Sequence, residues 1–364
     1  MKTASHLLSL LTAMLLLATI ALRRDGRLLG HSPVPDAPGP TAADGTAFLE
    51  NRADGTVVIN TAIPGAGING YMGPTPLYIH LKDGQVTLIE AQPNQDTPEF
   101  FSATLEDGFR EKWYGKTPRE ALAVSARPVT GATYSSTAFI QNVQVGLAAY
   151  LSAQGESAEA PAAAMSGEQF AKLLCGVLVA LAAAILPLLV KHKFYRPVQL
   201  VLNVLVLGFW CGTFVSHTLL VKFLSQGIRS WETLLPVLLL GMAFVYPFFG
   251  RKSHYCMHAC PFGSLQELVG KIQRKKLAIP PSLLAKLEIF RQLLWSALLF
   301  VMLCGSGFAW MDCEPFAAFL VRTAPVAALV LAVLFLVLSL FVQRPYCRFV
   351  CPTGSLLKFA EHDK

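Results

Sequence analysis

One short motif occurs twice in the second half of the chain. The first copy is YCMHACPFGSL at Tyr255–Leu265, and the second is YCRFVCPTGSL at Tyr346–Leu356. Both read Tyr-Cys-x-x-x-Cys-Pro-x-Gly-Ser-Leu, and each follows a long apolar segment that ends in basic residues. A repeat of this kind indicates two related structural units. We expect a pair of helical hairpins, each of which delivers two thiols to the same face of a membrane.

The composition is typical of a membrane protein. The chain has 364 residues, of which 53% are hydrophobic and 15% are charged, whereas soluble domains carry about 25% charged residues. The formal net charge is +7, but the basic residues cluster at the ends of apolar runs, where membrane topology explains them. We therefore expect no nucleic acid partner. The eight cysteines are too few and too scattered for a secreted disulfide scaffold.

Shifts in composition predict five parts. They are an N-terminal anchor helix at 1–24, a linker at 25–47, a soluble α+β domain at 48–151, a flexible linker at 152–168 and a membrane domain at 169–364. In the soluble part, strand patterns cover Thr56–Thr61, Pro76–Leu81 and Gln85–Ala91, with a hairpin turn at 82–84 and helices expected at Leu105–Tyr114 and Thr137–Leu151. The predicted fold class is an α+β domain joined to an all-α polytopic membrane domain.

The membrane part is expected to cross the bilayer about six times, counting the anchor. The apolar segments are Leu7–Leu22, Phe170–Val190, Val198–Val215, Leu234–Phe249, Ile289–Met311 and Pro325–Val342. The loops that carry the two cysteine motifs are strongly basic, and the loops between them are less so. The positive-inside rule therefore places both motifs and the C-terminus in the cytoplasm and the α+β domain outside it.

The motif itself suits thiolate chemistry. Proline is favoured at the first helical position, so we expect a helix to begin directly after Cys260 and another after Cys351. A thiol at a helix N-terminus lies at the positive end of the dipole, which favours the metal-binding thiolate. Two motifs together supply four thiolates, the usual complement of an iron–sulfur cluster. The candidate metal ligands are Cys256, Cys260, Cys347 and Cys351.

Three alternatives remain open for these cysteines. Each motif could hold part of a separate cluster. Four cysteines also form structural zinc sites, although zinc motifs usually lie on small polar domains. The thiols could also be buried and inert.

A second candidate site is the run Val129–Ser136, which precedes the last predicted helix of the α+β domain. Small residues let the backbone approach an anion, and the hydroxyls and free N–H groups at a helix start suit a phosphate. By itself this signal is weak, since such residues most often cap a helix. The candidate phosphate-binding residues are Thr130, Gly131, Ala132, Thr133 and Ser135.

Thr130-Gly131-Ala132-Thr133 resembles the Ser/Thr-Gly-Ala-Thr motif of the FMN-binding domain in the flavin subunits of Rnf and sodium-pumping NADH:quinone reductases. The segments 70–74, 96–98 and 109–116 resemble parts of the same domain. This resemblance implies that a flavin transferase joins FMN through a phosphoester to Thr133. It also adds Tyr71, Gly73 and Thr97 to the candidate FMN contacts. Arg127 and Glu99 depart from the family pattern, so non-covalent FMN is the alternative.

The paired Cys-x-x-x-Cys-Pro units resemble the membrane part of the nitrous-oxide-reductase regulator family and related quinol-oxidising ferredoxin-type membrane proteins. In the regulators an outer FMN domain precedes such a core, and a cytoplasmic ferredoxin domain follows it. The Cys-x-x-Cys runs of such a domain are not in this sequence, so we expect that role to belong to another protein. The resemblance therefore implies a bacterial inner-membrane protein with a periplasmic FMN domain. It also implies a separate cytoplasmic ferredoxin-type or quinone partner and a periplasmic redox partner.

The flavin and the cluster are expected on opposite sides of a hydrocarbon layer about 30 Å thick, so electron transfer needs a relay. Cys211 and Cys313 lie near the outer ends of corresponding spans and could ligate one. They could also form a disulfide or simply pack.

The functional prediction is transmembrane electron transfer between FMN and an iron–sulfur centre, by a redox component that need not act on a small substrate. The rival predictions are a redox-linked factor for maturation of a periplasmic metalloenzyme and a zinc-stapled membrane scaffold.

Overall fold

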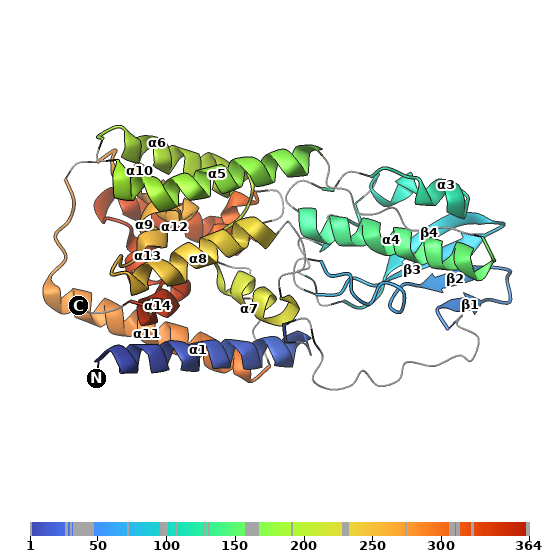
Figure 1. Cartoon of the computed structure of the whole chain (residues 1–364), viewed down its shortest axis with the longest axis horizontal. Helices are drawn as coiled ribbons and strands as arrows, with labels where there is room; N and C mark the ends of the chain where they lie inside the picture. The colour runs from blue at the N-terminus through green and yellow to red at the C-terminus, as the bar shows by residue number, and fades with distance from the viewer. Residues whose placement is uncertain are drawn as a thin grey trace. The chain divides into compact units, whose positions relative to one another are not determined.

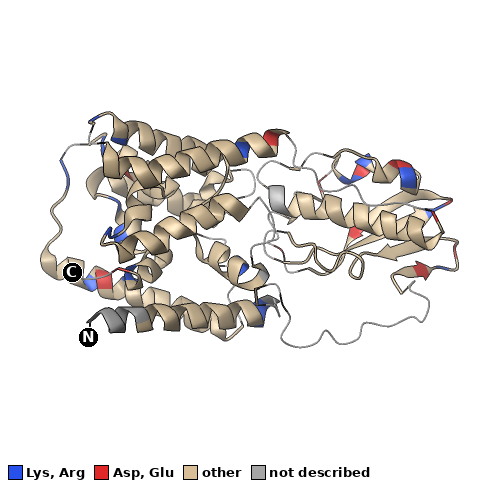
Figure 2. Cartoon of the chain, in the orientation of Figure 1, with Lys and Arg blue, Asp and Glu red and all other residues tan. Residues whose placement is uncertain are grey.

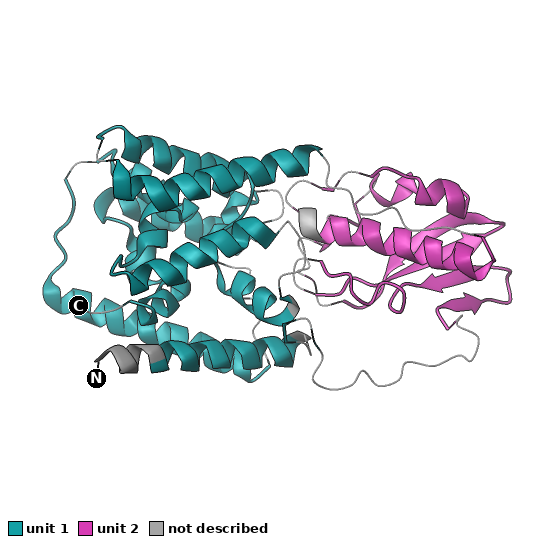
Figure 3. Ribbon diagram, in the orientation of Figure 1, with its two compact units in different colours: residues 1–34, 166–364 teal, residues 35–165 magenta. Residues whose placement is uncertain are grey.

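The computed structural model describes most of the chain, in two compact units. The described residues are 2–25, 28–29, 31, 47–70, 73–94, 96, 101–102, 104–106, 108–126, 128–129, 132–156, 167–190, 192–227, 233–273, 275–305, 310, 314–321 and 324–361. One unit is Pro35–Met165, and the other combines Met1–Val34 with Ser166–Lys364 (Figure 3). We call them the sheet unit and the helical unit.

The sheet unit contains a four-stranded antiparallel sheet in the order β1-β2-β3-β4. Its strands are β1 Leu49–Asn51, β2 Val57–Asn60, β3 Leu77–Lys82 and β4 Gln85–Ala91. The predicted hairpin turn is confirmed, because Lys82 pairs with Gln85 across it. Asp83 and Gly84 both have positive φ, at 51° and 73°, as the two central residues of a type I′ turn require.

Helix α4, Thr133–Ala153, packs against β2 and β3 (Figure 1). Its buried side chains Phe139, Val143 and Leu147 belong to the same apolar core as Ile59 and Ile79 of the sheet. The spacing of these helix residues is that of one helical face. Burial of this face holds α4, and therefore its N-terminal end, against the sheet.

The prediction of a helix at Leu105–Tyr114 is wrong. The structure has only a 3₁₀ turn at Arg110–Lys112, followed by the short helix α3, Pro118–Leu122. Gly108 has a φ of +87°, which ends any helix at that point. The apolar residues of the segment instead fill the core as an aromatic cluster, in which Trp113 lies 5.8 Å from both Phe109 and Phe139 between ring centroids.

The helical unit has a helix at every predicted span. Its long helices are α1 Lys2–Asp25, α5 Gly167–Leu189, α6 Tyr195–Leu202 continued by a π-helical stretch Asn203–Trp210, α8 Leu234–Phe248, α11 Pro281–Leu303 and α12 Val326–Phe341. Its shorter helices are α7 His217–Gln226, α9 His254–His258, α10 Pro261–Gly270, α13 Pro345–Phe349, α14 Pro352–Phe359 and the 3₁₀ helix Pro315–Phe319. The predicted span Val198–Val215 ends early, because the chain turns at Gly212, whose φ is +61°.

The repeated motif is a repeated structure. In the first copy α8 leads to α9 and α10, and in the second α12 leads to α13 and α14. A residue with left-handed backbone begins each turn, namely Ser253 with a φ of 52° and Arg344 with a φ of 50°. Among the described residues, α5 is both long and apolar enough to cross a membrane, while α8 and α12 are apolar but shorter.

Candidate functional site

The repeated motif places its cysteines at equivalent points of the two copies. Cys256 lies on α9 and Cys347 on α13, while Cys260 and Cys351 are the N-cap residues of α10 and α14. A proline occupies the first turn of each following helix. The prediction that helices begin after these two cysteines is therefore confirmed.

Each N-cap sulfur accepts a backbone hydrogen bond. Gly263 N donates to Cys260 Sγ at 3.4 Å, and Gly354 N donates to Cys351 Sγ at 3.2 Å. The sulfur thus takes the position that a Ser or Asp oxygen takes in an ordinary N-cap. At Gly263 a Cβ would lie 2.9 Å from the carbonyl oxygen of Cys256, so this position needs glycine.

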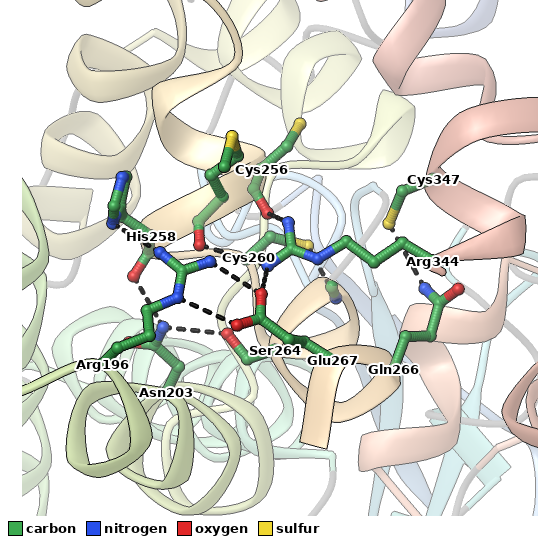
Figure 4. A network of polar contacts seen from close by, with 12 residues as sticks. Arg196, Asn203, Cys256, His258, Cys260, Ser264, Gln266, Glu267, Arg344 and Cys347 are labelled. Carbon is green, nitrogen blue, oxygen red and sulfur yellow. Dashed lines mark hydrogen bonds and ion pairs between the residues drawn. The ribbon is translucent and has the colours of Figure 1, made fainter. Parts of the chain in front are cut away.

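Side chains from each copy reach the other (Figure 4). Gln266 on α10 donates from Nε2 to Cys347 Sγ at 3.3 Å. Arg344, which precedes α13, donates from Nη1 to the carbonyl oxygen of Cys256 at 3.0 Å. The same guanidinium is paired with Glu267. The two cysteine motifs are therefore tied together by polar contacts rather than by apolar packing alone.

Glu267 lies between two guanidiniums, those of Arg344 and Arg196. Arg196 Nη2 is 2.7 Å from Glu267 Oε2, and its Nε is 3.0 Å from Oε1. Burial alone would raise the pKa of Glu267, but the hydrogen bonds and charges of the two arginines lower that pKa to about 2. His258 Nδ1 lies 3.0 Å from Arg196 Nη1, and burial together with nearby positive charge lowers the pKa of His258 to about 4. The group therefore carries a net positive charge beside the first cysteine motif.

The four motif thiols lie within electrostatic range of one another. Burial raises the pKa of Cys260 to about 12, with a further contribution from Cys347, and it raises the pKa values of Cys256 and Cys351 well above their ordinary range. The positive charge of Arg344 opposes this rise at Cys256 and Cys260. Four buried thiolates therefore need further positive charge, which bound metal supplies.

The donor set suits a metal centre. Four cysteine sulfurs are the usual ligands of an iron–sulfur cluster, and four cysteines also occur in structural zinc sites. Among the described residues, no three His, Cys, Asp or Glu side chains are already arranged around one metal ion. The guanidiniums of Arg344 and Arg196 beside the first motif would offset the negative charge of thiolate ligands. The chemistry of these residues therefore fits an iron–sulfur cluster.

The helical unit also contains a cluster of buried polar side chains. His217 and Glu314 were each weak candidates in the sequence, for a haem and for proton or quinone chemistry, but the sequence did not show that they lie together. His217 at the start of α7 is 1% exposed and Glu314 is 4% exposed, and His217 Nδ1 lies 3.4 Å from Glu314 Oε1. Trp295 Nε1 donates to His217 Nε2 at 3.2 Å, so the neutral imidazole carries its proton on Nδ1. Thr353, two residues after Cys351, is hydrogen-bonded to the same Nδ1 at 3.1 Å. These residues come from four separate segments, so no local pattern could have predicted this arrangement.

The proposed relay cysteines are only partly described. Cys211 is a free thiol at the end of the π-helical stretch, and its Sγ donates to the carbonyl oxygen of Lys172 at 3.4 Å. The Cys211 side chain packs against α5. Cys313 lies outside the described residues, so both a relay and a disulfide between the two cysteines stay predictions.

The sheet unit places the second candidate site at the N-terminus of α4. Ala132 is the N-cap residue and is buried, and its side chain makes no capping hydrogen bond. Thr133 is the first helical residue, four positions earlier than the predicted start, and its side chain is outside the described part. The uncapped N–H groups at this end suit an anion such as phosphate. The remaining candidates Thr130, Gly131, Tyr71 and Thr97 lie outside the described residues.

Ser135 and Gly73 have structural partners beside this helix end. The hydroxyl of Ser135 is fully buried and donates to Asp96 Oδ2 at 2.5 Å. Gly73 O accepts from Gly70 N at 2.8 Å, and a Cβ at Gly70 would collide with Asp96. Asp96 therefore joins the segment around Gly70–Gly73 to α4. The sequence offered one signal for a role of Asp96. Asp96 directly precedes Thr97-Pro98, in a segment that resembles the FMN-binding domain.

Two domain families match the chain at these places. The model of the FMN-binding domain matches residues 70–148, which include the N-terminus of α4. The model of the 4Fe-4S binding domain matches residues 232–280 and 324–362, which include all four motif cysteines. Both domain types bind redox cofactors, so the matches support a role in electron transfer or redox regulation.

Three curated proteins resemble the chain. It is 26% identical to protein NirI of Paracoccus denitrificans over 313 residues, which is 77% of this chain and 44% of NirI. It is 29% identical to regulatory protein NosR of Stutzerimonas stutzeri over 211 residues, which is 49% of this chain and 28% of NosR. It is 26% identical to YccM of Escherichia coli, whose name describes a candidate electron transport protein, over 33% of this chain and 37% of YccM.

The chain thus spans less than half the length of each of these relatives. No solved structure matches it significantly. The resemblance expected from the sequence is confirmed: the chain carries an FMN-binding domain and a 4Fe-4S binding domain and is homologous to NirI and to the regulator NosR.

Proposed function

We propose that this protein carries electrons across a bacterial inner membrane, between an FMN on the periplasmic side and an iron–sulfur centre on the cytoplasmic side. The observation that carries the proposal is the convergence of the two cysteine motifs. Gln266 bonds to Cys347, and Arg344 bonds to the backbone of Cys256, so each copy helps to build the surroundings of the other copy's thiols.

The cluster would be held by Cys256, Cys260, Cys347 and Cys351. When bound, it accepts and releases single electrons. The protein supplies backbone donors to two of the sulfurs, through Gly263 and Gly354, and a nearby guanidinium. Burial keeps water away from this region, which strengthens each of these interactions.

The flavin would be joined by its phosphate to Thr133, with non-covalent binding as the alternative. Thr133 is the first residue of α4, and its N-cap residue is an alanine, so the phosphate would lie where the helix dipole is positive. The buried contact between Ser135 and Asp96 holds this helix end against the segment that follows β4. A flavin transferase is the partner that this linkage requires.

The membrane arrangement is a proposal of six crossings, formed by α1, α5, α6 with the π-helical stretch, α8, α11 and α12. Helices α8 and α12 carry no charged residue, and the charges of α5 lie near its start (Figure 2). Large apolar side chains are exposed along one face of α12, at Val326, Val330, Val333 and Val337. An apolar surface of this extent is expected to face lipid. The basic loops support a cytoplasmic location for the cysteine motifs.

On the periplasmic side, a redox partner would either supply electrons to this protein or accept electrons from it. On the other side the partner would be a ferredoxin-type protein or a quinone. The relay between the two cofactors would use Cys211 and Cys313. A second candidate function is redox-linked regulation or maturation of a periplasmic metalloenzyme, which is favoured by the similarity to NosR, a regulatory protein by name. It predicts the same cofactors with little steady electron flow.

The cofactors are tested first, on anaerobically purified full-length protein. We expect iron and acid-labile sulfide, an EPR signal on reduction and flavin fluorescence on a denaturing gel. Cys351→Ser should remove the EPR signal, and Thr133→Ala should remove the gel fluorescence. Thr137→Ala is the matched control, because Thr137 is one turn further along α4 and its Oγ1 has no hydrogen-bond partner among the described residues. Protein that contains zinc without iron or sulfide would contradict the cluster.

Electron flow is tested in proteoliposomes with the flavin inside and membrane-impermeant dithionite outside. Flavin reduction should be fast in the parent protein and slow in Cys351→Ser. Equally fast rates in both would show that the electrons bypass the cluster and would reject the conduit, whereas slow rates in both would favour the regulatory function. A reporter fused after Leu151 that is active only in the cytoplasm would overturn the proposed topology.

A further inference from the structure

The two copies differ at the position that directly follows each cysteine motif. When the copies are aligned, Gln266 of the first corresponds to Leu357 of the second. Both side chains are buried, so the difference is not one of exposure. Only the glutamine can donate a hydrogen bond.

The orientation of the Gln266 amide is determined by its neighbours. Its Oε1 accepts from the backbone N–H of Tyr346 at 3.1 Å. Its Nε2 faces the carbonyl oxygen of Phe262 at 3.5 Å and Cys347 Sγ at 3.3 Å. A flipped amide would put an oxygen against that carbonyl and an NH₂ against an N–H group, so both contacts would be lost. The group that faces the sulfur is therefore the donor.

The side chain is also shielded from competing water. Gln266 is 0% exposed, and a hydrogen bond in such surroundings is electrostatically stronger than one in water. The donors to the other motif sulfurs are backbone groups, from Gly263 to Cys260 and from Gly354 to Cys351. Among the described residues, none donates to Cys256 Sγ in the hydrogen bonds of the structure. Among the described residues, Gln266 is thus the side chain that donates a hydrogen bond to a motif sulfur.

We propose that Gln266 is a positioning residue that raises the reduction potential of the iron–sulfur centre through its hydrogen bond to Cys347. This inference rests on the proposed function, since it requires a cluster on these cysteines. Reduction adds one electron, taken from the external reductant, and no bond to the protein is made or broken. The added negative charge is shared with the ligand sulfurs, so an N–H donor stabilises the reduced form more than the oxidised form.

The test is an EPR-monitored redox titration of the full-length, anaerobically purified protein. Gln266→Met keeps the length of the side chain and removes the donor. We expect the equilibrium constant for reduction to fall about tenfold, as for the loss of one hydrogen bond to a charged group, which is ~59 mV for a one-electron couple. Gln266→Glu should lower the constant further, because it keeps an acceptor for Tyr346 N–H but places a carboxylate beside the sulfur.

Leu357→Met is the matched control at the corresponding position of the second copy, and its potential should equal that of the parent. An unchanged potential in Gln266→Met, with full iron and sulfide, would overturn the inference. So would an equal fall in Leu357→Met, because packing would then explain the effect. If Gln266→Met fails to assemble the cluster, the reduction potential of Gln266→Glu is compared with that of the parent instead, and an unchanged potential would overturn the inference. If neither variant retains the cluster while the control does, the residue is required for assembly and the inference is wrong.

These outcomes are distinguishable from failure of the proposed function. A parent protein without iron and sulfide would reject the cluster itself. Resonance Raman spectra give a second readout, because loss of the N–H donor should shift the iron–cysteine sulfur stretch in Gln266→Met and leave it unchanged in Leu357→Met.

Discussion

Replacing Glu267 by glutamine should destabilise the helical unit through its two arginine partners. The carboxylate is 14% exposed, while the side chains of Arg344 and Arg196 are 10% and 27% exposed. Glu267→Gln keeps the shape and removes the negative charge, which leaves two mostly buried guanidiniums without a counter-charge. Breaking a buried ion pair by removing one partner costs about 3–5 kcal/mol.

The pKa of Glu267 gives a second measure of the free energy that its negative charge contributes to folding. The pKa of Glu267 falls from 4.5 to about 2. A tenfold change in proton affinity is worth about 1.4 kcal/mol, so the charged form is favoured by about 3 kcal/mol in the folded protein. Because the folded pKa is below the unfolded value, this stabilisation is complete above pH 4.5 and is lost as the pH falls toward 2. The difference between parent and Glu267→Gln should therefore shrink over that range.

The assay is thermal unfolding in detergent at pH 7.5, followed by tryptophan fluorescence, with iron content measured alongside. A loss of 3 kcal/mol lowers Tm by roughly 6–12 °C in a unit of this size. Glu288→Gln is the matched control, because Glu288 is 53% exposed and its close partner is Lys358 at 2.6 Å, while its second partner Arg291 is 3.9 Å away. Exposed pairs of this kind are worth less than about 1 kcal/mol. An equal fall in Tm in both variants would refute the reasoning.

Three further predictions follow from single contacts. Gly263→Ala should lose most of the bound iron, because its Cβ would lie 2.9 Å from Cys256 O, whereas Gly354→Ala should retain it, because the nearest atom there is 3.5 Å away; iron per protein is the measurement. Asp96→Ala should destabilise the sheet unit by about 1–3 kcal/mol, because the buried Ser135 hydroxyl loses its acceptor; calorimetry checks this, and an unchanged Tm contradicts it. Trp295→Phe should cost the helical unit a similar amount, because His217 Nε2 loses its donor; a fall in Tm no larger than in Glu288→Gln would be the contrary result.

Much of the local structure was predictable from short patterns. The hairpin of β3 and β4 is predicted by an Asp-Gly pair between alternating apolar residues. The helix starts at Cys260 and Cys351 are predicted by the prolines that directly follow these cysteines. Where prediction failed, a single residue overrode the pattern. The amphipathic segment Leu105–Tyr114 reads as a helix, but the positive φ of Gly108 breaks it and the aromatic side chains enter the core.

The sequence by itself determined the two domain types, the repeated cysteine motif and the helices that present its thiols, because these depend on periodicity, caps and spacing over a few residues. Only the tertiary structure decided which groups surround the sulfurs. Gln266 and Cys347 are 81 positions apart, Arg344 and Cys256 are 88 apart, and His217 and Glu314 are 97 apart. Such pairs meet because two homologous halves pack against each other, and the geometry of that packing is set by the apolar core as a whole rather than by either local sequence.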